Sequence, residues 1–386
     1  RSTLFPYTTL FRSRDDGQGY AIRGLEYTTN KNYHGLFGVL IDGAVVENFS
    51  VYGTITNEGY DAIAAIAYSK NDSEPNYIRN IHSYLNITSS GEDKKVGGIL
   101  GNGNNGTTYV DRCIFSGSIS STNKTNCGGI VAYIQNNSGA HVNISNCIFD
   151  GTLESEISNT YCGGIVGYSI ASSSVYTITN CLSFGTVTGP IAGSIFGYVR
   201  NAGGGFSNNY YFGSATSGKS DGDYNVAISV SEEQLASGEI AYVLNGDQST
   251  IAFYQTLPDD DVPTLDNTHK QVYANGRQHC DGSAYEGTTY SNENLGVVKD
   301  EHDFVDGFCF YCDIFDESYS MTPNAEGYYE IGSANHLRWF SIYSNTKDHA
   351  AKAILTDDIA LTKAWTTPIG TGSGNVAPGA TAYTGI

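Results

Sequence analysis

The residues best suited to chemistry lie between positions 279 and 312, where three cysteines and two histidines occur. Thiolate sulfur and imidazole nitrogen are the ligands of closed, tetrahedral zinc sites. The surrounding segment is acidic and poor in apolar residues, so a bound metal would supply stability that packing cannot. The spacing, which ends in a Cys-x-x-Cys pair, predicts one zinc site formed by Cys280, His302, Cys309 and Cys312. His279 is the substitute ligand if His302 points away.

Two other states of these cysteines remain open on the sequence alone. Secreted proteins often oxidise such pairs, which would give a Cys309–Cys312 disulfide and leave Cys280 free. The third possibility is that all three are free thiols.

Catalytic motifs are not evident elsewhere in the chain. The sequence does not contain the His-Glu-x-x-His pattern of zinc peptidases. Glycan-cleaving sites need paired carboxylates on one face, but Asp111, Asp150 and Glu154 are predicted to be scattered outward residues. The three aspartates at 259–261 lack the alternating ligands of a calcium loop and are predicted to form a solvated turn. We therefore expect no enzyme activity from this chain.

The elements that must position these residues follow a repeat of about 32 residues that fills positions 14–213. A small-residue hexamer recurs as HGLFGV, AAIAYS, GGILGN, GGIVAY, GGIVGY and GSIFGY, beginning at residues 34, 64, 97, 128, 163 and 193. A second element follows each copy as NFSVYG, NIHSYL, RCIFSG, NCIFDG, NCLSFG and NNYYFG. One repeat cannot bury its own apolar face, so the copies must stack. The repeat predicts an all-β fold dominated by a right-handed parallel β-solenoid of about six coils.

The cysteines of the repeat are predicted to stack on neighbouring coils in two ladders: Cys113 with Cys147 and Cys181, and Cys127 with Cys162. Disulfides within each coil (Cys113–Cys127 and Cys147–Cys162) are the alternative. Because Ala192 stands where Cys181 would find its partner, buried free thiols are favoured. Recurring tyrosines, namely Tyr133, Tyr168 and Tyr198, are predicted to form a ladder of their own.

These repeats resemble the GLUG repeat of bacterial surface proteins, on the strings GGIVGY, NCIFDG and TNCLSFGTVTG. The resemblance covers about half of the chain. The copy at 64–69 departs from the pattern by losing both glycines, which leaves the local turn there open. The resemblance implies a secreted or cell-wall-attached protein, often adhesin-like and sometimes the non-catalytic part of a large peptidase.

The segments after the solenoid are predicted to form three parts. Residues 214–270 read as a connector and a helical cap over the last coil, with a capping box at Ser231 and Gln234 and a C-cap at Gly246. Residues 271–320 form the acidic Cys/His linker. Residues 321–386 resemble the truncated start of a second β-rich repeat module, in which Ser333 caps a helix and strands follow in KAILTDDIAL and WTTPIG.

Residues 1–13 are interpreted as an artefact. The string RSTLFPYTTLFRS, back-translated with suitable codons, matches a widely used sequencing-library adapter throughout. We therefore exclude it from fold reasoning and expect it to pack against nothing specific. Both ends of the chain are interpreted as truncated, and the ending is in phase with the beginning. This phase predicts a tandem array of modules.

Composition limits the remaining function classes. The 386 residues carry a net charge of −20, with abundant Gly and Tyr, which argues against nucleic-acid binding. No run of 18 apolar residues that could span a membrane occurs. The sequence therefore predicts an extracellular or cell-surface repeat protein, a stalk or adhesin that binds a host protein or a glycan. The alternative is the substrate-binding β-helix of a larger secreted glycan-active enzyme or peptidase.

Overall fold

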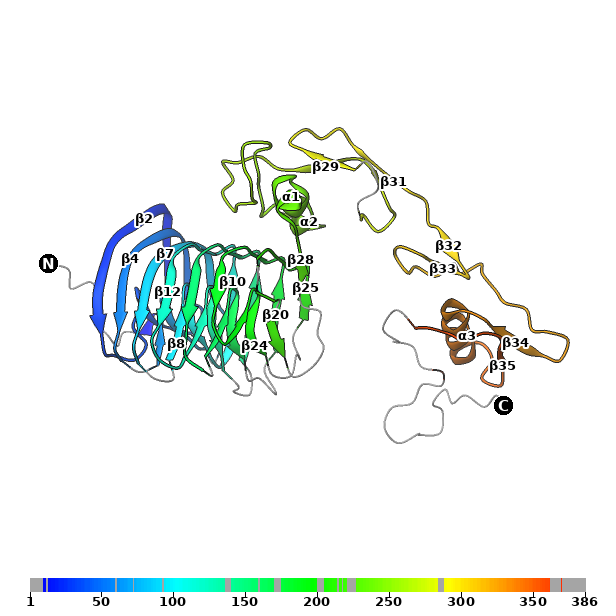
Figure 1. Cartoon of the computed structure of the whole chain (residues 1–386), viewed down its shortest axis with the longest axis horizontal. Helices are drawn as coiled ribbons and strands as arrows, with labels where there is room; N and C mark the ends of the chain where they lie inside the picture. The colour runs from blue at the N-terminus through cyan, green and yellow to red at the C-terminus, as the bar shows by residue number, and fades with distance from the viewer. Residues whose placement is uncertain are drawn as a thin grey trace. The chain divides into compact units, whose positions relative to one another are not determined.

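The chain divides into two compact units in the computed structural model (Figure 1). Unit 1 comprises Arg1–Ala274 and Tyr290–Asn294, and unit 2 comprises Asn275–Thr289 and Leu295–Ile386. The structure describes residue 369 and residues 10–361, apart from residues 12, 60, 72, 92–93, 136–139, 159, 170–174, 200–204, 214, 217, 221–226 and 284–287.

Unit 1 is a parallel β-solenoid of about six coils, as the repeat predicts. Its walls are three parallel sheets that run along the stack of coils (Figure 1). The first sheet contains β1 (Leu10–Phe11), β3 (Phe37–Leu40), β6 (Ile66–Ser69), β9 (Leu100–Gly103), β14 (Val131–Ile134), β19 (Val166–Ser169), β24 (Phe196–Val199) and β27 (Gly218–Ser220). The second contains β2 (Arg14–Thr29), β4 (Val45–Asn57), β7 (Asn76–Ser89), β10 (Gly106–Asp111), β11 (Ile114–Phe115), β12 (Ser118–Ser121), β15 (Ala140–Ser145), β16 (Ile148–Phe149), β17 (Thr152–Ser155), β20 (Val175–Thr179), β21 (Leu182–Ser183), β22 (Thr186–Thr188), β25 (Gly205–Ser207), β26 (Tyr210–Tyr211) and β28 (Ile228–Ser229). The third contains β5 (Ala62–Ile63), β8 (Lys94–Gly97), β13 (Thr125–Gly128), β18 (Tyr161–Gly163) and β23 (Ile191–Gly193).

The interior of the solenoid is filled by the inward residues of all three sheets. Phe115 pairs in register with Phe149 on the next coil, and both side chains are fully buried. The glycines of the hexamer make room for these rings, because an added Cβ at Gly98 would collide with Phe115 and one at Gly129 with Phe149. Small residues and aromatic rings therefore alternate across the core.

The cysteines of the solenoid lie in the two predicted ladders, and all of them are free and buried. Cys127 and Cys162 are register partners, and Ala192 occupies the next position of that row. In the other row, Cys147 lies in hydrogen-bonding contact with both neighbouring thiols, Cys113 and Cys181. Burial and these contacts raise the pKa of the Cys147 thiol well above its usual value, so it stays protonated. The structure therefore contains the free thiols rather than the disulfides.

The tyrosine ladder is also present. Tyr168 is the register partner of Tyr133 and of Tyr198, and each pair of ring centroids lies 5.6 Å apart.

The copy at 64–69 has a shorter corner than the later coils. Ile63 pairs with Val96, whereas Ile66 pairs with Leu100, so two residues of this coil oppose three of the next. The alignment of the second hexamer therefore shifts by one residue from the sequence-based one. In the next coil, Gly97 and Gly98 belong to a corner of three residues. The coil at 64–69 has only two residues at this corner, and both are alanines.

The first residues do not behave as expected. Residues 1–9 and 12 lie outside the described residues, but Leu10 and Phe11 pair in parallel with Val39 and Leu40. The carbonyl of Ser13 also accepts a hydrogen bond from the Val45 amide at 3.0 Å. The prediction that residues 1–13 pack against nothing specific is therefore wrong for these three. The edge of the first sheet offers unpaired backbone groups, which a short extended segment of any origin can satisfy.

The connector after residue 213 extends the solenoid. Strand β27 pairs with β24, and β28 pairs with β26, both in parallel. The last complete coil would otherwise leave its backbone groups unpaired. The polar, glycine-rich sequence gives no strand signal, because hydrogen bonding rather than side-chain burial holds it there.

The helical cap consists of α1 (Glu232–Ala236) and α2 (Glu239–Asn245). Ser231 and Gln234 form the predicted capping box, and Gly246 is the C-cap. The cap buries outward-facing side chains of several coils, among them Ile148 and Leu182, in its own apolar cluster. It therefore covers a flank of the solenoid and not only its last coil.

Unit 2 has fewer regular elements, and two strands, β29 and β30, contain residues of both units. In chain order, the remaining elements are β29 (Tyr273–Gln278), β30 (Thr289–Ser291), β31 (Val297–Lys299), β32 (Phe304–Val305), β33 (Phe308–Cys309), β34 (Tyr328–Ile331), α3 (Ala334–Thr346) and β35 (Lys352–Leu355). Ser333 caps α3 as predicted, and β35 lies within the predicted strand region, parallel to β34. The predicted strand in WTTPIG lies outside the described residues except for Ile369.

The register of the core yields a direct test. Ile165 is fully buried inside the solenoid. We expect Ile165→Asp to cost about 4 kcal/mol, because an unpaired charge would be buried, and to lower the melting temperature by roughly 10 °C. The measurement is thermal unfolding followed by circular dichroism of the β-sheet signal.

The control for this test is Ile165→Val, which keeps the site apolar and should cost about 1 kcal/mol. A melting temperature of Ile165→Asp equal to that of the control would contradict the register.

Candidate metal centre

The Cys-x-x-Cys pair follows a tight β-hairpin in unit 2. Strands β32 and β33 pair in an antiparallel manner and are joined by Asp306 and Gly307, whose φ angles are 50° and 84°. An Asp-Gly pair with two positive φ angles is the sequence that a two-residue type I′ turn favours. The hairpin delivers Cys309 at the end of β33. The backbone then turns back, so that the amide of Asp313 donates to the carbonyl of Cys309 at 3.1 Å.

All four predicted ligands meet at this turn. The sulfur atoms of Cys280, Cys309 and Cys312 and one ring nitrogen of His302 all lie within 4.8 Å of one another. The Sγ atoms of Cys280 and Cys309 are 3.4 Å apart, and Sγ of Cys312 lies 3.2 Å from Nδ1 of His302. A tetrahedron with metal–ligand distances of about 2.0–2.3 Å has edges of roughly 3.3–3.8 Å. The cluster is therefore compatible with a four-coordinate metal site.

The same distances describe free thiols. A disulfide requires two sulfur atoms about 2.05 Å apart, and Cys280, Cys309 and Cys312 are all unbonded. The Cys309–Cys312 disulfide, which the sequence leaves open as an alternative to the zinc site, is thus not formed in this structure.

Local hydrogen bonds prepare Cys309 for the thiolate state. Burial alone would raise the pKa of this thiol. The backbone amide of Cys312, the His302 ring, the amide of Tyr311 and the Cys280 thiol together outweigh burial and lower the pKa of Cys309 to about 6. In contrast, burial and the two neighbouring thiols raise the pKa of Cys280 to about 12. A cation would be needed to hold both as thiolates, which are the metal-binding form.

His279 is not part of the cluster. Its ring stacks on Tyr311 with centroids 3.7 Å apart, and its Nδ1 lies 3.9 Å from a carboxylate oxygen of Asp300. The structure therefore uses His302 and gives His279 a supporting position beside the Cys-x-x-Cys turn.

The hairpin packs against the helix α3. Phe308 is buried in one apolar cluster with Trp339 and Phe340 of the helix. The hydroxyl of Ser333, the N-cap of α3, donates to Asp306 at 2.6 Å, and the Arg338 guanidinium lies over the Phe308 ring at 4.2 Å. The cysteine segment and the helix after it consequently share one core, although their sequences predict two separate parts.

The carboxylates considered for catalysis lie in different surroundings. Asp111 accepts hydrogen bonds from Ser145 at 2.7 Å and from Asn146 at 2.8 Å. Of the three aspartates at 259–261, Asp260 lies 2.6 Å from Nδ1 of His269, whereas its two neighbours are exposed. The turn is therefore only partly solvated, and the contact with His269 carries no signal in the sequence.

One further pattern carries no chemistry. Residues 213–220 match the P-loop consensus Gly-x-x-x-x-Gly-Lys-Ser. Gly218–Ser220 form strand β27 of the solenoid, rather than the beginning of a helix that a P-loop needs to bind phosphate.

Comparisons with known proteins give one structural similarity. No protein-family model and no curated protein matches the chain, so the resemblance to GLUG repeats stays a prediction. A crystal structure from Bacteroides ovatus, described as that of a candidate immunoglobulin A1 protease, aligns with a TM-score of 0.41 and 17% identity. The alignment covers 65% of this chain and 76% of the other. At this level it assigns no function. Among the described residues, no helix is long and apolar enough to cross a membrane.

The lowered pKa of Cys309 predicts how the metal-free unit 2 responds to pH. The pKa is about 6 in the folded chain and near 9 for an ordinary cysteine. The folded state is therefore stabilised more as the pH rises from 6 to 9, and this stabilisation is lost as the pH falls through 6. Cys280 contributes no slope in this window, because it stays protonated in both states until the pH approaches 9.

The measurement is the urea midpoint of the metal-free chain at several pH values, followed by tryptophan fluorescence. Both tryptophans, Trp339 and Trp365, belong to unit 2, so the signal reports this unit alone. Cys309→Ser should remove the pH slope. An identical slope in this variant would contradict the assignment.

Proposed function

We propose that this chain is a non-catalytic, extracellular repeat protein, a surface stalk or adhesin, whose solenoid presents a ligand-binding flank. The observation that carries the proposal is the stacking itself. Equivalent positions on neighbouring coils are occupied by side chains that bind each other, such as the thiols of Cys147 and Cys181 and the rings of Tyr168 and Tyr198. Side chains that contact their equivalents on the neighbouring coils stabilise the stack. They are then not available as catalytic groups.

The placement of the carboxylates supports the non-catalytic part of the proposal. Glycoside hydrolysis needs two carboxyl groups facing one bond. Asp111 is engaged by Ser145 and Asn146, and the register partners of Glu154 are Ser120 and Thr188, which are not acidic. Asp150, the third acid considered, is hydrogen-bonded to Ser116, and burial raises the pKa of its carboxyl group. Among the contacts of the described residues, none of the three acids is paired with another acid.

The extracellular part rests on composition and on the resemblance of the repeats to GLUG repeats. We also propose that residues 1–13 are of artefactual origin, because the string RSTLFPYTTLFRS matches a sequencing-library adapter when it is back-translated. The pairing of β1 does not oppose this view, because an open sheet edge binds extended segments with little regard to side chains.

In unit 2, we propose that Cys280, His302, Cys309 and Cys312 bind one zinc ion. Three sulfur ligands and one nitrogen ligand match a structural zinc site better than a magnesium or calcium site, which would require oxygen ligands. The role would be structural, because a fully protein-ligated ion has no open position for substrate. The ion would fasten the Cys280 turn to the hairpin that carries Phe308 into the core.

Zinc binding has a clear expected outcome. The full chain purified without chelator should contain about one zinc per chain, and the urea midpoint of unit 2 should rise with added zinc, because the folded state alone binds it. Cys312→Ser should abolish both effects. The control is Cys181→Ser, which removes a buried thiol of the solenoid and should leave the zinc content unchanged. Equal zinc content in the two variants would refute the site.

The proposed function is tested on immobilised mucin. We expect the full chain to be retained on this surface while releasing neither reducing sugar ends nor new amino termini from it. Product release by the purified chain would contradict the non-catalytic assignment and favour the enzyme alternative. Absence of any retention would contradict the adhesin assignment on this ligand.

A further inference from the structure

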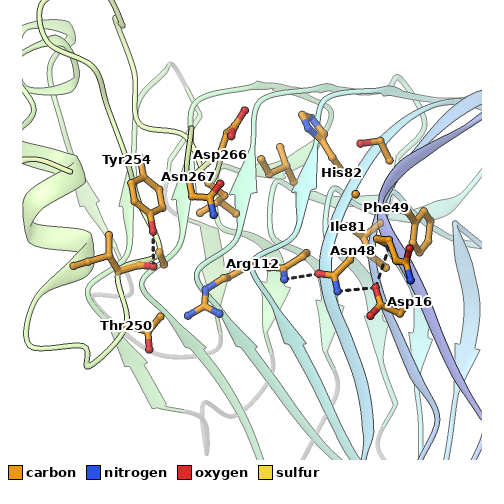
Figure 2. Close-up of a pocket in the computed structure, with 18 residues that line it drawn as sticks. Asp16, Asn48, Phe49, Ile81, His82, Arg112, Thr250, Tyr254, Asp266 and Asn267 are labelled. Atoms are coloured by element: carbon orange, nitrogen blue, oxygen red, sulfur yellow. Dashed lines mark hydrogen bonds between the residues drawn. The ribbon is translucent and has the colours of Figure 1, made fainter. Parts of the chain in front are cut away.

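A groove of about 750 Å³ runs along the flank of unit 1. Figure 2 shows its two sides: one is formed by the solenoid coils that carry Asp16, Asn48 and Arg112, and the other by the cap segment that carries Thr250, Tyr254 and Asp266. Its size is that of a typical small-ligand site. The groove lies next to the apolar cluster between the cap and the solenoid. Ile114 packs against that cluster and also lines the groove.

The solenoid side is built from a ladder of amides. The first residue of the second element of each repeat has a positive φ. In five of the six coils it is an asparagine, which tolerates this conformation well: Asn48, Asn80, Asn146, Asn180 and Asn208. The Asn80 amide donates to Asn48 at 2.8 Å, and the Asn48 amide donates to Asp16 at 3.0 Å (Figure 2). The ladder thus places polar planar groups at each rung, about 4.8 Å apart.

Arg112 interrupts this ladder within the groove. Its φ is 52°, so a long, charged side chain occupies a position where the fold favours asparagine. Nη1 of Arg112 lies 3.6 Å from Asp111, while Nε is buried and has no hydrogen-bond partner among the described residues. Structural preference does not account for this residue. A residue held in an unfavourable conformation at a cleft is a reason to look for a ligand.

The side chains that line the groove favour a neutral ligand with many hydroxyl groups. Arg112 is the only Lys or Arg among the described lining residues, and Asp16 and Asp266 face the groove in a chain of net charge −20, so polyanions are disfavoured. Amides, carboxylates and a guanidinium are planar groups that pair with neighbouring hydroxyls. Ile114, Ile251 and Tyr254 add apolar patches.

An extended peptide fits the groove less well. Peptides that bind to sheets usually add a strand to a free edge. The strands on this flank are already paired with the neighbouring coils on both sides: β4 with β2 and β7, and β7 with β10. Recognition must therefore use side chains, at regularly spaced rungs, which suits a polymer of repeating hydroxylated units.

We propose that this groove binds a neutral oligosaccharide, with Arg112 donating hydrogen bonds to its hydroxyl groups. The inference rests on the proposed function, since it names the ligand class that the flank presents. The sugar chain would run along the solenoid axis, with the amides of Asn48 and Asn80 on one side and Asp266 on the other. The apolar patches would face the C–H surfaces of the sugar rings.

The test is isothermal titration calorimetry of the full chain with cellohexaose, mannohexaose and maltohexaose, and with hexagalacturonate as the acidic probe. At least one neutral hexasaccharide should bind. Arg112→Asn should weaken that binding about tenfold or more, because hydrogen bonds from a charged donor are lost. This variant should fold normally, since asparagine occupies the equivalent position in the other coils. The control, Lys299→Asn, removes the same charge from an exposed site in unit 2 and should bind like the unchanged chain.

Three outcomes would overturn the inference: no binding of any neutral hexasaccharide, binding of hexagalacturonate alone, or unchanged binding by Arg112→Asn. The proposed function fails separately. If Arg112→Asn is retained on mucin as well as the unchanged chain, the groove is not the binding site, but the adhesin assignment stands. If a bound hexasaccharide is cleaved, the groove is a binding site, but the non-catalytic assignment is wrong.

Discussion

The structure of unit 1 depends on one constraint, which is that each coil supplies the hydrogen-bond partners of the next. Strands β4, β7 and β10 pair only with neighbouring coils, so every coil must place the same backbone groups at the same height. This requirement explains why the repeat keeps a length of about 32 residues, why the first residue of each second element has a positive φ, and why glycines make room for Phe115 and Phe149. It also explains the added strands β27 and β28, because polar segments are recruited where the backbone would otherwise be unpaired.

Unit 2 is stabilised by specific side-chain contacts rather than by stacked repeats. Its apolar cluster around Trp339 and Phe340 is small, and the hairpin contributes Phe308 to it. The Cys/His cluster holds the turn that precedes this hairpin, so a bound ion and the helix α3 would stabilise the same few residues. The chain thus combines a rod stabilised by repetition with a small unit stabilised by specific contacts.

Much of this could be predicted from the sequence wherever a local pattern repeats or a chemical type is rare. The stacked cysteines follow from the spacing of the repeat, the caps Ser231 and Ser333 from their helix signals, and the four-residue Cys/His cluster from the scarcity of such ligands. What could not be predicted depends on contacts between distant segments. The contact of Asp260 with His269, the cap on the flank over Ile148, and the groove between two segments of the chain have no periodic signal. The short corner at Ile63–Ile66 was misaligned by one residue because alanine imitates glycine in a small-residue pattern.

The account is tested most directly by locating the sulfur atoms from their anomalous X-ray scattering in a crystal of the full chain. Stacked coils predict that the sulfurs of Cys113, Cys147 and Cys181 form one straight row with a spacing of about 4.8 Å, and that those of Cys127 and Cys162 lie in a second row at the same spacing. Each sulfur would be separate from its neighbours. Sulfur pairs at bonding distance between the two rows, or sulfurs scattered over different faces, would contradict the stacking on which the rest of the structure depends.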